Sequence, residues 1–400
     1  MRETFLAQKE NKNILMKKTI LRLCINSGEY SIAGLSKELN ASVPTVTKLI
    51  LELMADGFMV DLGKHGTSGG RRPSIYGLNP SAGYFVGVDI RHSHVALAVT
   101  DFKGNLISFQ DNHPFVFEHT EESVRRIGRS VRTFFEVNGL EWDKVLGLGV
   151  SVTGRVNPTT GESFSYPFPE GMTISSILSE ELDIPVTVEN DSRAMTYGEY
   201  LSGVVKKEKN VLFVNISWGL GMGIIMDGKL HYGKSGFSGE IGHVPLLNND
   251  TICRCGKRGC LETGASGSAL HRMVLEELRN GRASSLSARF NKGEKITIND
   301  IYKAIHEEDV LAIEIVEEVG DTLGRGIAGL INIFNPELVV IGGKMAVAGD
   351  YLMLPVRSAV KKYAQNFVGK DTSIKFSKLG REAASIGACM LSRSKLLGVL

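Results

Sequence analysis

The chain has 400 residues, of which 42% are hydrophobic and 22% charged, and it carries a formal net charge of +2 and five cysteines. This length is enough for two or three domains with sizeable cores. It has no apolar run long enough to span a bilayer and no apolar leader, which argues against membrane contact and predicts a cytoplasmic protein with reduced cysteines. Residues 1–80 hold 11 Lys or Arg and seven Asp or Glu, so this segment carries +4 and the remainder −2. The basic N-terminal segment is a candidate for contact with a polyanion.

The N-terminal segment has the pattern of a helix-turn-helix. One helix is expected over residues 11–26, a second after the N-cap Ser31 and a third after the N-cap Ser42. The third helix has an apolar stripe with i, i+3, i+4, i+7 spacing, formed by Val46, Leu49, Ile50 and Leu53. Small polar and basic residues remain on its outward side, and these are predicted to read DNA bases in the major groove: Thr45, Thr47 and Lys48.

A basic hairpin is predicted directly after these helices. Residues 58–62 and 75–78 form two strands, joined by a glycine-rich basic tip. Arg71 and Arg72 in this tip are predicted to contact phosphates or the minor groove, as in a winged helix-turn-helix domain. A three-helix packing module with solvated charges is the alternative that these residues leave open.

Four residues with short spacings predict a metal site: His243, Cys253, Cys255 and Cys260. Three thiolates and an imidazole from a tight loop are the donors of a closed tetrahedral Zn²⁺ site. Unrelated buried thiols are the weaker alternative, because charged residues lie between the cysteines. A set of disulfides is weaker still, because Cys24 and Cys389 would be left over.

Two carboxylates flank this metal motif. Glu240 precedes His243 by three residues and Glu262 follows Cys260 by two, so a bound metal would fix two acceptors for a polyhydroxylated ligand. The pattern Glu-x-x-His, followed by Cys-x-Cys-Gly-x-x-Gly-Cys-x-Glu, resembles that of the ROK family of sugar kinases and sugar-responsive repressors. This resemblance implies that Glu240, His243 and Glu262 contact a sugar, and that His243 and the cysteines hold structural zinc.

The remainder of the chain alternates strands and helices. Strands are expected at residues 84–90, 95–100, 106–110 and 145–152, with a helix from Thr120, and a similar order begins again at Val211 with strands near 212–217, 223–226 and 230–232. This pattern supports an α/β fold. The family resemblance implies a duplicated ribonuclease H-like or actin-like sugar kinase fold with two lobes and a sugar cleft between them.

The N-terminal helix-turn-helix pattern and the strand and helix pattern that follows it predict three domains. The winged helix-turn-helix domain occupies residues 1–80, and the first α/β lobe occupies 81–190 and is completed by a C-terminal helix at 381–400. The second lobe, at 191–380, carries the zinc site and a dimerisation surface.

Asn190 and Asp191 are further candidates for sugar binding. They end a short strand and precede a helix, and polar residues at that end of a strand face the ligand crevice in open α/β sheets. An Asx turn that caps the helix is the alternative for one of the two. The resemblance implies that Asp191 matches the general base of the ROK kinases.

The segments that would bind nucleotide depart from the kinase pattern. ROK kinases have Asp-x-Gly-Gly-Thr-Lys after the first strand, whereas this chain has Asp89-Ile90-Arg91-His92-Ser93-His94. A second glycine-rich segment, at residues 217–223, has Trp218 where the kinases usually have Thr, and Gly342-Gly343 resembles the adenosine-side turn. ATP and Mg²⁺ are therefore not expected to bind.

Together these patterns predict a sugar-responsive transcriptional repressor of carbohydrate metabolism genes. The N-terminal segment resembles the winged helix of the ROK repressors, the branch that includes the xylose and N-acetylglucosamine repressors, and the kinases lack it. The expected partners are operator DNA and a sugar effector, and the expected assembly is a homodimer or a dimer of dimers. The alternative is an ATP-dependent sugar kinase, possibly bifunctional. A scaffold without a ligand is disfavoured by the clustered polar residues.

Overall fold

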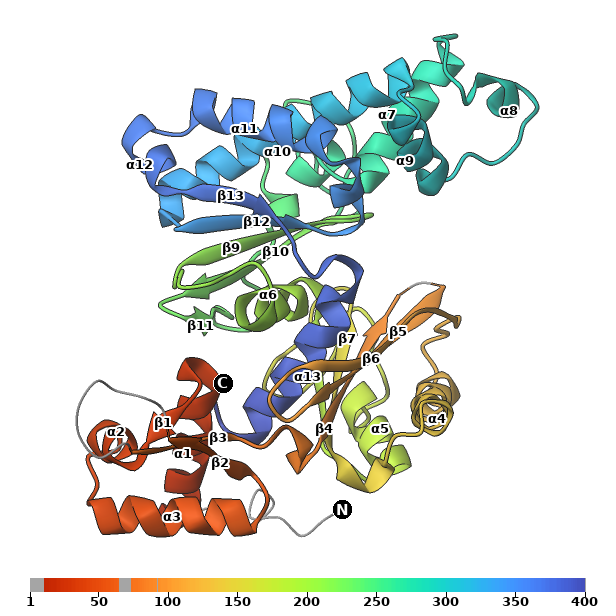
Figure 1. Ribbon diagram of the computed structural model, residues 1–400. Coiled ribbons are helices and arrows are strands. Elements are labelled where there is room, and N and C mark those ends of the chain that lie inside the picture. The colour runs from red at the N-terminus through yellow and green to blue at the C-terminus, as the bar shows by residue number, and fades with distance from the viewer. Residues whose placement is uncertain (1–10, 65–72, 92, 400) are drawn as a thin grey trace. The chain divides into compact units, whose positions relative to one another are not determined.

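The computed structural model describes residues 11–64, 73–91 and 93–399 (Figure 1). The chain divides into two compact units. Unit 1 comprises Met1–Ala194 and Ala384–Leu400, and unit 2 comprises Met195–Ala383. The three-part division given by the sequence stays a prediction, because unit 1 contains both the N-terminal helices and the first α/β sheet.

The N-terminal part of unit 1 contains three helices and a small sheet. Asn11, Ser31 and Ser42 cap the three helices, since each side chain accepts a backbone N–H of the first turn. The sheet has the strand order β1-β3-β2. The elements are α1 (Lys12–Ser27), β1 (Tyr30–Ser31), α2 (Ile32–Glu38), α3 (Val43–Ala55), β2 (Met59–Lys64) and β3 (Ser74–Leu78).

These elements confirm the expected helices and the hairpin, with one addition. All four residues of the predicted α3 stripe are buried. The short strand β1 was not predicted, and it pairs antiparallel with β3 at Tyr30 and Ser31. The predicted wing tip, with Arg71 and Arg72, lies outside the described residues.

Two five-stranded sheets of the same topology form the α/β part, one in each unit. In unit 1 the order is β6-β5-β4-β7-β8, and in unit 2 it is β11-β10-β9-β12-β13. In each sheet the first three strands in sequence are antiparallel neighbours and the last two are added in parallel. These mixed sheets confirm the α/β fold class and the duplication.

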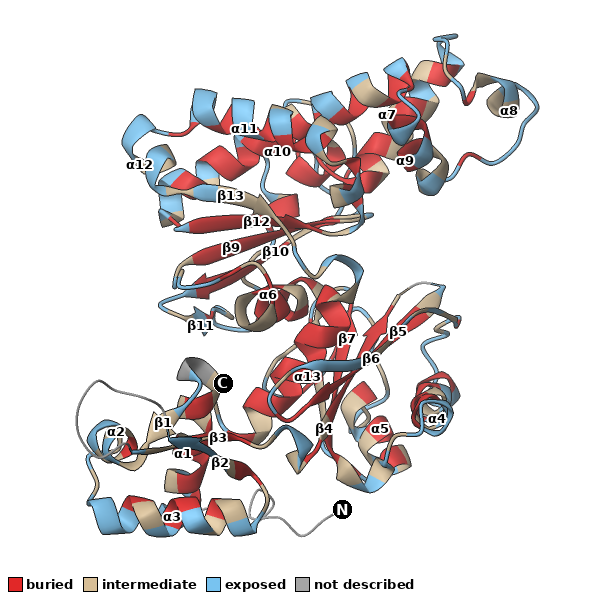
Figure 2. Cartoon of the chain, viewed as in Figure 1, coloured by how far each residue is buried: buried red, intermediate tan, exposed pale blue. Residues whose placement is uncertain are grey.

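The unit 1 sheet carries helices α4 (Glu121–Val137) and α5 (Ile174–Leu182), together with α13 (Ala383–Leu396), and its central strands are buried (Figure 2). Its strands are β4 (Tyr84–Ile90), β5 (His94–Asp101), β6 (Leu106–Pro114), β7 (Val145–Val152) and β8 (Val186–Asn190). Two strand glycines let α13 approach closely: a Cβ at Gly87 would lie 1.9 Å from the Ser385 carbonyl oxygen, and one at Gly149 would lie 2.0 Å from that of Ala388.

The N-terminal helices are joined to this sheet through the turn at residues 101–105. The Phe102 ring packs edge-on against Phe58, with 5.2 Å between centroids, and is fully buried. Arg393 of α13 donates from Nη1 to the Lys103 carbonyl at 2.7 Å. Arg22 of α1 donates from Nε to the carbonyl of Leu397 at 3.0 Å. Helix α1 therefore contacts the residue that follows α13, and Phe58 contacts the turn to which Arg393 of α13 is bonded.

Unit 2 packs its helices against the second sheet. Its strands are β9 (Val211–Ile216), β10 (Leu220–Met226), β11 (Lys229–Leu230), β12 (Leu338–Gly342) and β13 (Ser373–Phe376). Its helices are α7 (Gly267–Arg279), α8 (Ser287–Asn291), α9 (Ile298–His306), α10 (Val310–Phe334), α11 (Asp350–Tyr363) and α12 (Asn366–Asp371), while α6 (Asp191–Ser202) continues from unit 1. No helix in the described part of the chain has both the length and the apolar character needed to cross a membrane.

Candidate functional site

The four predicted metal ligands come together in unit 2. One ligand atom from each of His243, Cys253, Cys255 and Cys260 lies within 4.8 Å of all the others. The His243 Nδ1 atom lies 3.5 Å from the Cys253 Sγ atom, and the Sγ atoms of Cys255 and Cys260 are 3.6 Å apart. The edges of a tetrahedral Zn²⁺ site with one imidazole and three thiolates are about 3.5–3.8 Å long. The cluster can therefore hold a metal ion, and its donors are those of a zinc site.

Backbone hydrogen bonds within the loop hold the conformation of the segment that carries the cysteines. The Cys253 N–H donates to the Lys257 carbonyl at 2.8 Å, and the Gly256 N–H donates back to the Cys253 carbonyl at 2.8 Å. Gly256 has a φ of +84°, which favours glycine. At Gly259, with a φ of +75°, a Cβ would lie 2.5 Å from the Leu247 carbonyl oxygen. The glycines of the motif thus allow the turn that brings the thiols together. None of the five cysteines, all of which lie in the described residues, forms a disulfide.

The two carboxylates of the motif lie beside this cluster. The Glu240 Oε2 atom is 3.7 Å from the Nε2 atom of His243, on the opposite side of the ring from the thiols. Glu262 is 7% exposed, and its Oε2 accepts the Leu220 N–H at 2.9 Å while its Oε1 lies 3.5 Å from the Arg254 guanidinium. A metal on His243 would thus leave one imidazole nitrogen toward Glu240, which fixes the ring orientation.

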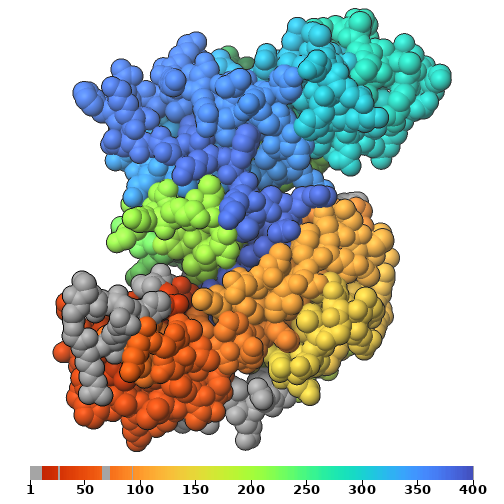
Figure 3. Space-filling view, viewed as in Figure 1, coloured from red at the N-terminus to blue at the C-terminus, as the bar shows by residue number. Residues whose placement is uncertain are grey.

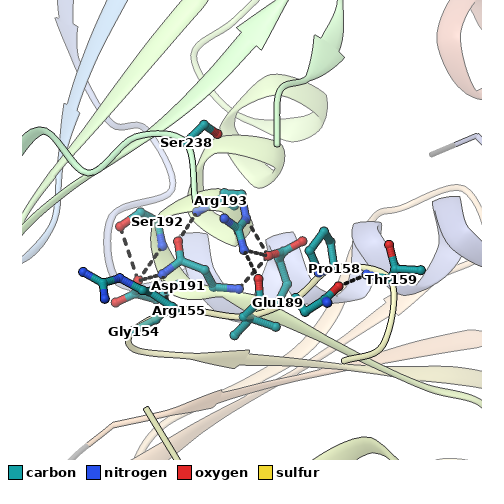
Figure 4. Close-up of polar contacts among 12 residues, drawn as sticks. Gly154, Arg155, Pro158, Thr159, Glu189, Asp191, Ser192, Arg193 and Ser238 are labelled. Carbon is teal, nitrogen blue, oxygen red and sulfur yellow. Dashed lines mark hydrogen bonds and ion pairs between the residues drawn. The ribbon is translucent and has the colours of Figure 1, made fainter. Parts of the chain in front are cut away.

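In unit 1, Asn190 and Asp191 form the junction between β8 and α6 (Figure 4). The Asn190 Oδ1 atom accepts the Arg193 N–H at 3.1 Å, and its Nδ2 donates to the Gly154 carbonyl at 2.8 Å and to Asp191 Oδ1 at 2.9 Å. Asp191 Oδ1 also accepts the Ser192 N–H at 2.7 Å. Asn190 therefore caps the helix, as the Asx alternative predicted, and ties the loop at residues 154–158 to it.

A buried ion pair that the sequence analysis missed supports this junction. The Arg193 guanidinium lies 2.6 Å from Glu189 Oε1, and these side chains are only 4% and 2% exposed. Arg193 also donates from Nη2 to the Val156 carbonyl at 3.0 Å. The sequence carries no local signal for this pair, because Glu189 lies on β8 and Arg193 on α6, and burial of such a pair is uncommon and set by the tertiary structure.

Asp191 has a perturbed acidity. Burial and the nearby Asp89 carboxylate raise the pKa of Asp191 to about 6, although hydrogen bonds from Ser192 and Thr153 act in the opposite direction. A carboxylate with such a pKa accepts hydroxyl protons well near neutral pH.

This shift predicts a pH-dependent stability. Between the ordinary pKa of 3.8 and about 6, the folded chain holds a proton on Asp191 that the unfolded chain has lost. The unfolding free energy should therefore fall as pH rises from about 4 to about 6, by about 1–3 kcal/mol relative to Asp191→Asn. Urea unfolding of the wild type and of Asp191→Asn at a series of pH values measures this difference. If the unfolding free energies of the two proteins changed in parallel with pH, the pKa of Asp191 would not be raised.

Asp89, near the end of β4, forms an ion pair with Arg91. The Arg91 Nε atom lies 2.5 Å from Asp89 Oδ2, and Arg91 Nη1 lies 3.0 Å from Asp111 Oδ1 of β6. Burial disfavours the guanidinium charge, but the two carboxylates outweigh this effect and raise the pKa of Arg91. Ser151 donates to the second Asp89 oxygen at 3.0 Å. Arg91 therefore lies against the carboxylate that begins the predicted phosphate motif, while His92 lies outside the described residues.

The second glycine-rich segment, residues 217–223, is only partly a turn, because its second half belongs to a strand. Strand β10 begins at Leu220, so Gly221 and Gly223 pair with β9 and only residues 217–219 form the turn. The expected strand start at residue 223 was wrong because these glycines were taken as loop residues. The first α7 amides are bonded to this turn, Gly267 N–H to the Ser217 carbonyl and Ser268 N–H to that of Trp218. Trp218 is 49% exposed, and its ring centroid is 5.7 Å from that of His271.

The predicted site residues thus fall into separate groups. Glu240, Glu262 and the metal cluster belong to unit 2, Asn190 and Asp191 belong to unit 1, and the predicted DNA-reading residues of α3 are at its outward side. The sugar contacts and the DNA contacts stay predictions.

The two similar mixed sheets and the metal motif define a class, the actin-like sugar kinase-type fold. Residues 85–395 match the ROK family. The chain belongs to the ROK family.

Three relatives differ in how much of this chain they cover. The xylose repressor of Caldicellulosiruptor bescii is 28% identical over 393 residues, which cover 97% of either chain. The crystal structure of a ROK family transcriptional regulator, described as a homologue of the Escherichia coli MLC protein, has a TM-score of 0.81 and 25% identity, covering 96% of this chain and 97% of its own. The ROK family glucokinase from Streptomyces griseus, solved with glucose and AMPPNP, has a TM-score of 0.67 and 26% identity, covering 78% of this chain and 100% of its own.

Proposed function

We propose that this protein is a sugar-responsive transcriptional repressor that binds operator DNA through its N-terminal helix-turn-helix. The observation that carries this proposal is the segment N-terminal to residue 85. The family match begins at residue 85, yet the xylose repressor and the regulator structure match 97% and 96% of the chain and so include this segment. The glucokinase matches 78% of the chain over its whole length. A basic segment with a capped helix-turn-helix suits DNA binding in the cytoplasm.

A sugar kinase is the second candidate, because one catalytic feature favours it. Asp191 has the raised pKa of a general base. The Arg91–Asp89 ion pair argues against phosphoryl transfer, since a guanidinium is held where the kinase motif has glycine and binds the carboxylate of that motif. The repressor is therefore the better-supported function, with ATP and Mg²⁺ not required.

The effector site is proposed from the polar residues already described. Glu240, His243 and Glu262 of unit 2 are proposed to hydrogen-bond to a sugar, and so, separately, are Asn190 and Asp191 of unit 1. Zn²⁺ held by His243 and the three cysteines would order the loop that bears the two glutamates. Zinc in this site has a structural role.

Contacts within unit 1 offer a route from Asp191 to the DNA-binding helices. Strand β8 ends next to Asp191, and the sheet to which it belongs packs against α13. Arg393 of α13 donates a hydrogen bond to the turn at residues 101–105, and Phe102 of that turn packs against Phe58. A change around Asp191 that moves α13 would therefore reach the N-terminal helices. Operator binding as a homodimer would match a two-fold symmetric site.

The experiment that tests this function measures DNA binding, sugar binding and ATP turnover in the same protein. We expect operator affinity to change when a cognate monosaccharide is added, without ATP and with no sugar-dependent ATP hydrolysis. Asp191→Asn should weaken sugar binding by about 10-fold or more and raise the sugar concentration that shifts DNA binding by the same factor. Sugar phosphorylation by the wild type that is lost in Asp191→Asn would instead establish the kinase.

A further inference from the structure

An apolar ridge runs along the outward face of α3. Val43, Thr47, Leu51 and Ala55 recur every four residues and so form one ridge along the helix. Val43 is 53% exposed and Leu51 is 58% exposed. A shallow groove beside this ridge has an almost wholly apolar lining, made by Val43, Pro44, Thr47, Lys48, Leu51, Glu52 and Ala55. In the space-filling view, atoms of the N-terminal segment form the surface where Figure 1 labels α3 (Figure 3).

The two threonines on this face have local partners for their hydroxyl groups. The Thr47 Oγ1 donates to the Val43 carbonyl at 2.8 Å, and the Thr45 Oγ1 lies 2.8 Å from the Ser42 Oγ. A hydroxyl that donates to its own helix has no proton left for a base edge. What Thr47 adds to the ridge is therefore mainly its methyl group, which differs from the polar readout expected from the sequence.

An exposed lysine lies beside the ridge, where it can reach a DNA phosphate. Lys48 lies beside the ridge with its side chain 72% exposed. Glu52, the one acidic residue lining the groove, has its carboxylate 3.1 Å from Lys17 Nζ and 3.9 Å from Lys48 Nζ. Lys17 Nζ also lies 3.2 Å from Asp56 Oδ2, so these two lysines face two carboxylates. An apolar stripe with an exposed lysine beside it, on the second helix of a helix-turn-helix, suits the major groove of DNA.

We propose that α3 recognises its operator chiefly through the 5-methyl groups of thymines, which contact the ridge of Val43, Thr47 and Leu51. The thymine methyl is the apolar group that base pairs present in the major groove, and aliphatic side chains are its partners. This inference rests on the proposed DNA-binding function and deepens it. It names the chemistry that α3 reads, and it assigns Lys48 to the phosphates.

The test removes methyl groups from DNA without changing base pairing. A high-affinity duplex is selected from random-sequence DNA with the full-length protein, and each thymine is then replaced singly by deoxyuridine. At one or more thymines in each half-site we expect affinity to fall roughly three- to tenfold. At those positions Leu51→Ala or Val43→Ala should abolish the difference between thymine and deoxyuridine, as in a double-mutant cycle. Val137→Ala is the matched control, since Val137 is 80% exposed on α4 of the same unit.

The outcomes separate this inference from the function on which it rests. Failure to select any preferred sequence would overturn the repressor function itself. A preferred sequence whose affinity is unchanged by every deoxyuridine would overturn methyl recognition and leave the repressor standing. If Leu51→Glu changed the oligomeric state while the deoxyuridine series stayed flat, the ridge would be a protein interface.

Discussion

Loss of the metal should destabilise unit 2 and abolish effector binding together. We expect Cys255→Ser to lose most of the one metal equivalent per chain and at least about 5 kcal/mol of unfolding free energy, because structural zinc contributes about 10–16 kcal/mol of apparent binding free energy in small zinc domains. The Cys255 side chain is at an exposed position, so the substitution itself leaves no cavity. Sugar affinity should fall by about 10-fold to 100-fold, because Glu240 and Glu262 are positioned by the same loop.

Metal analysis, denaturant unfolding and sugar titration of the same samples measure these three quantities. Cys389→Ala is the control, since Cys389 is a buried thiol of unit 1 outside the cluster. Its metal content should stay at the wild-type value whatever its effect on stability. Zinc-free protein after purification without chelator, or unchanged sugar affinity in Cys255→Ser, would refute the structural role.

What the sequence predicted well is what depends on nearby residues. The caps at Ser31 and Ser42 follow from side chains that bond an amide three residues on, and the buried stripe of α3 follows from the helical period. The metal cluster was also predictable, because three of its ligands lie within eight residues on a glycine-shaped loop. The repeated strand order indicated an α/β fold, and the family resemblance indicated the duplication.

What escaped prediction depends on partners that are distant in sequence or on burial. Arg91 binds Asp111, which is 20 residues away on β6, two strands from β4, so the sequence showed bulk at the glycine position but not an internal ion pair. The start of β10 was missed because glycines that favour a loop are held in the sheet by β9. Strand β1 has only two residues, too few for an alternating pattern. The apolar side of α3 was overlooked because its threonines were counted as polar.

Arg193→Ala should strongly destabilise unit 1. It would leave the Glu189 carboxylate buried without its cation, and Glu189 Oε2 already has no hydrogen-bond partner in the described structure. Removing one member of a buried ion pair costs about 3–5 kcal/mol. The loop at residues 154–158 would also lose its bond from Arg193 to Val156, and Asn190 would lose support for its contacts to Gly154 and Asp191.

Denaturant unfolding and amide hydrogen exchange together distinguish this local loss from a general one. Exchange should accelerate first at residues 154–158 and at the start of α6, and sugar affinity should fall with it, because Asp191 lies at that junction. Arg129→Ala is the matched control, since Arg129 pairs with Glu122 on the exposed side of α4 and such pairs contribute at most about 1 kcal/mol. The double variant Glu189→Leu with Arg193→Met should recover much of the stability, because an apolar pair of similar volume avoids the desolvation of two charges. If Arg193→Ala cost no more than Arg129→Ala, the Glu189–Arg193 pair would not be what holds this junction in place.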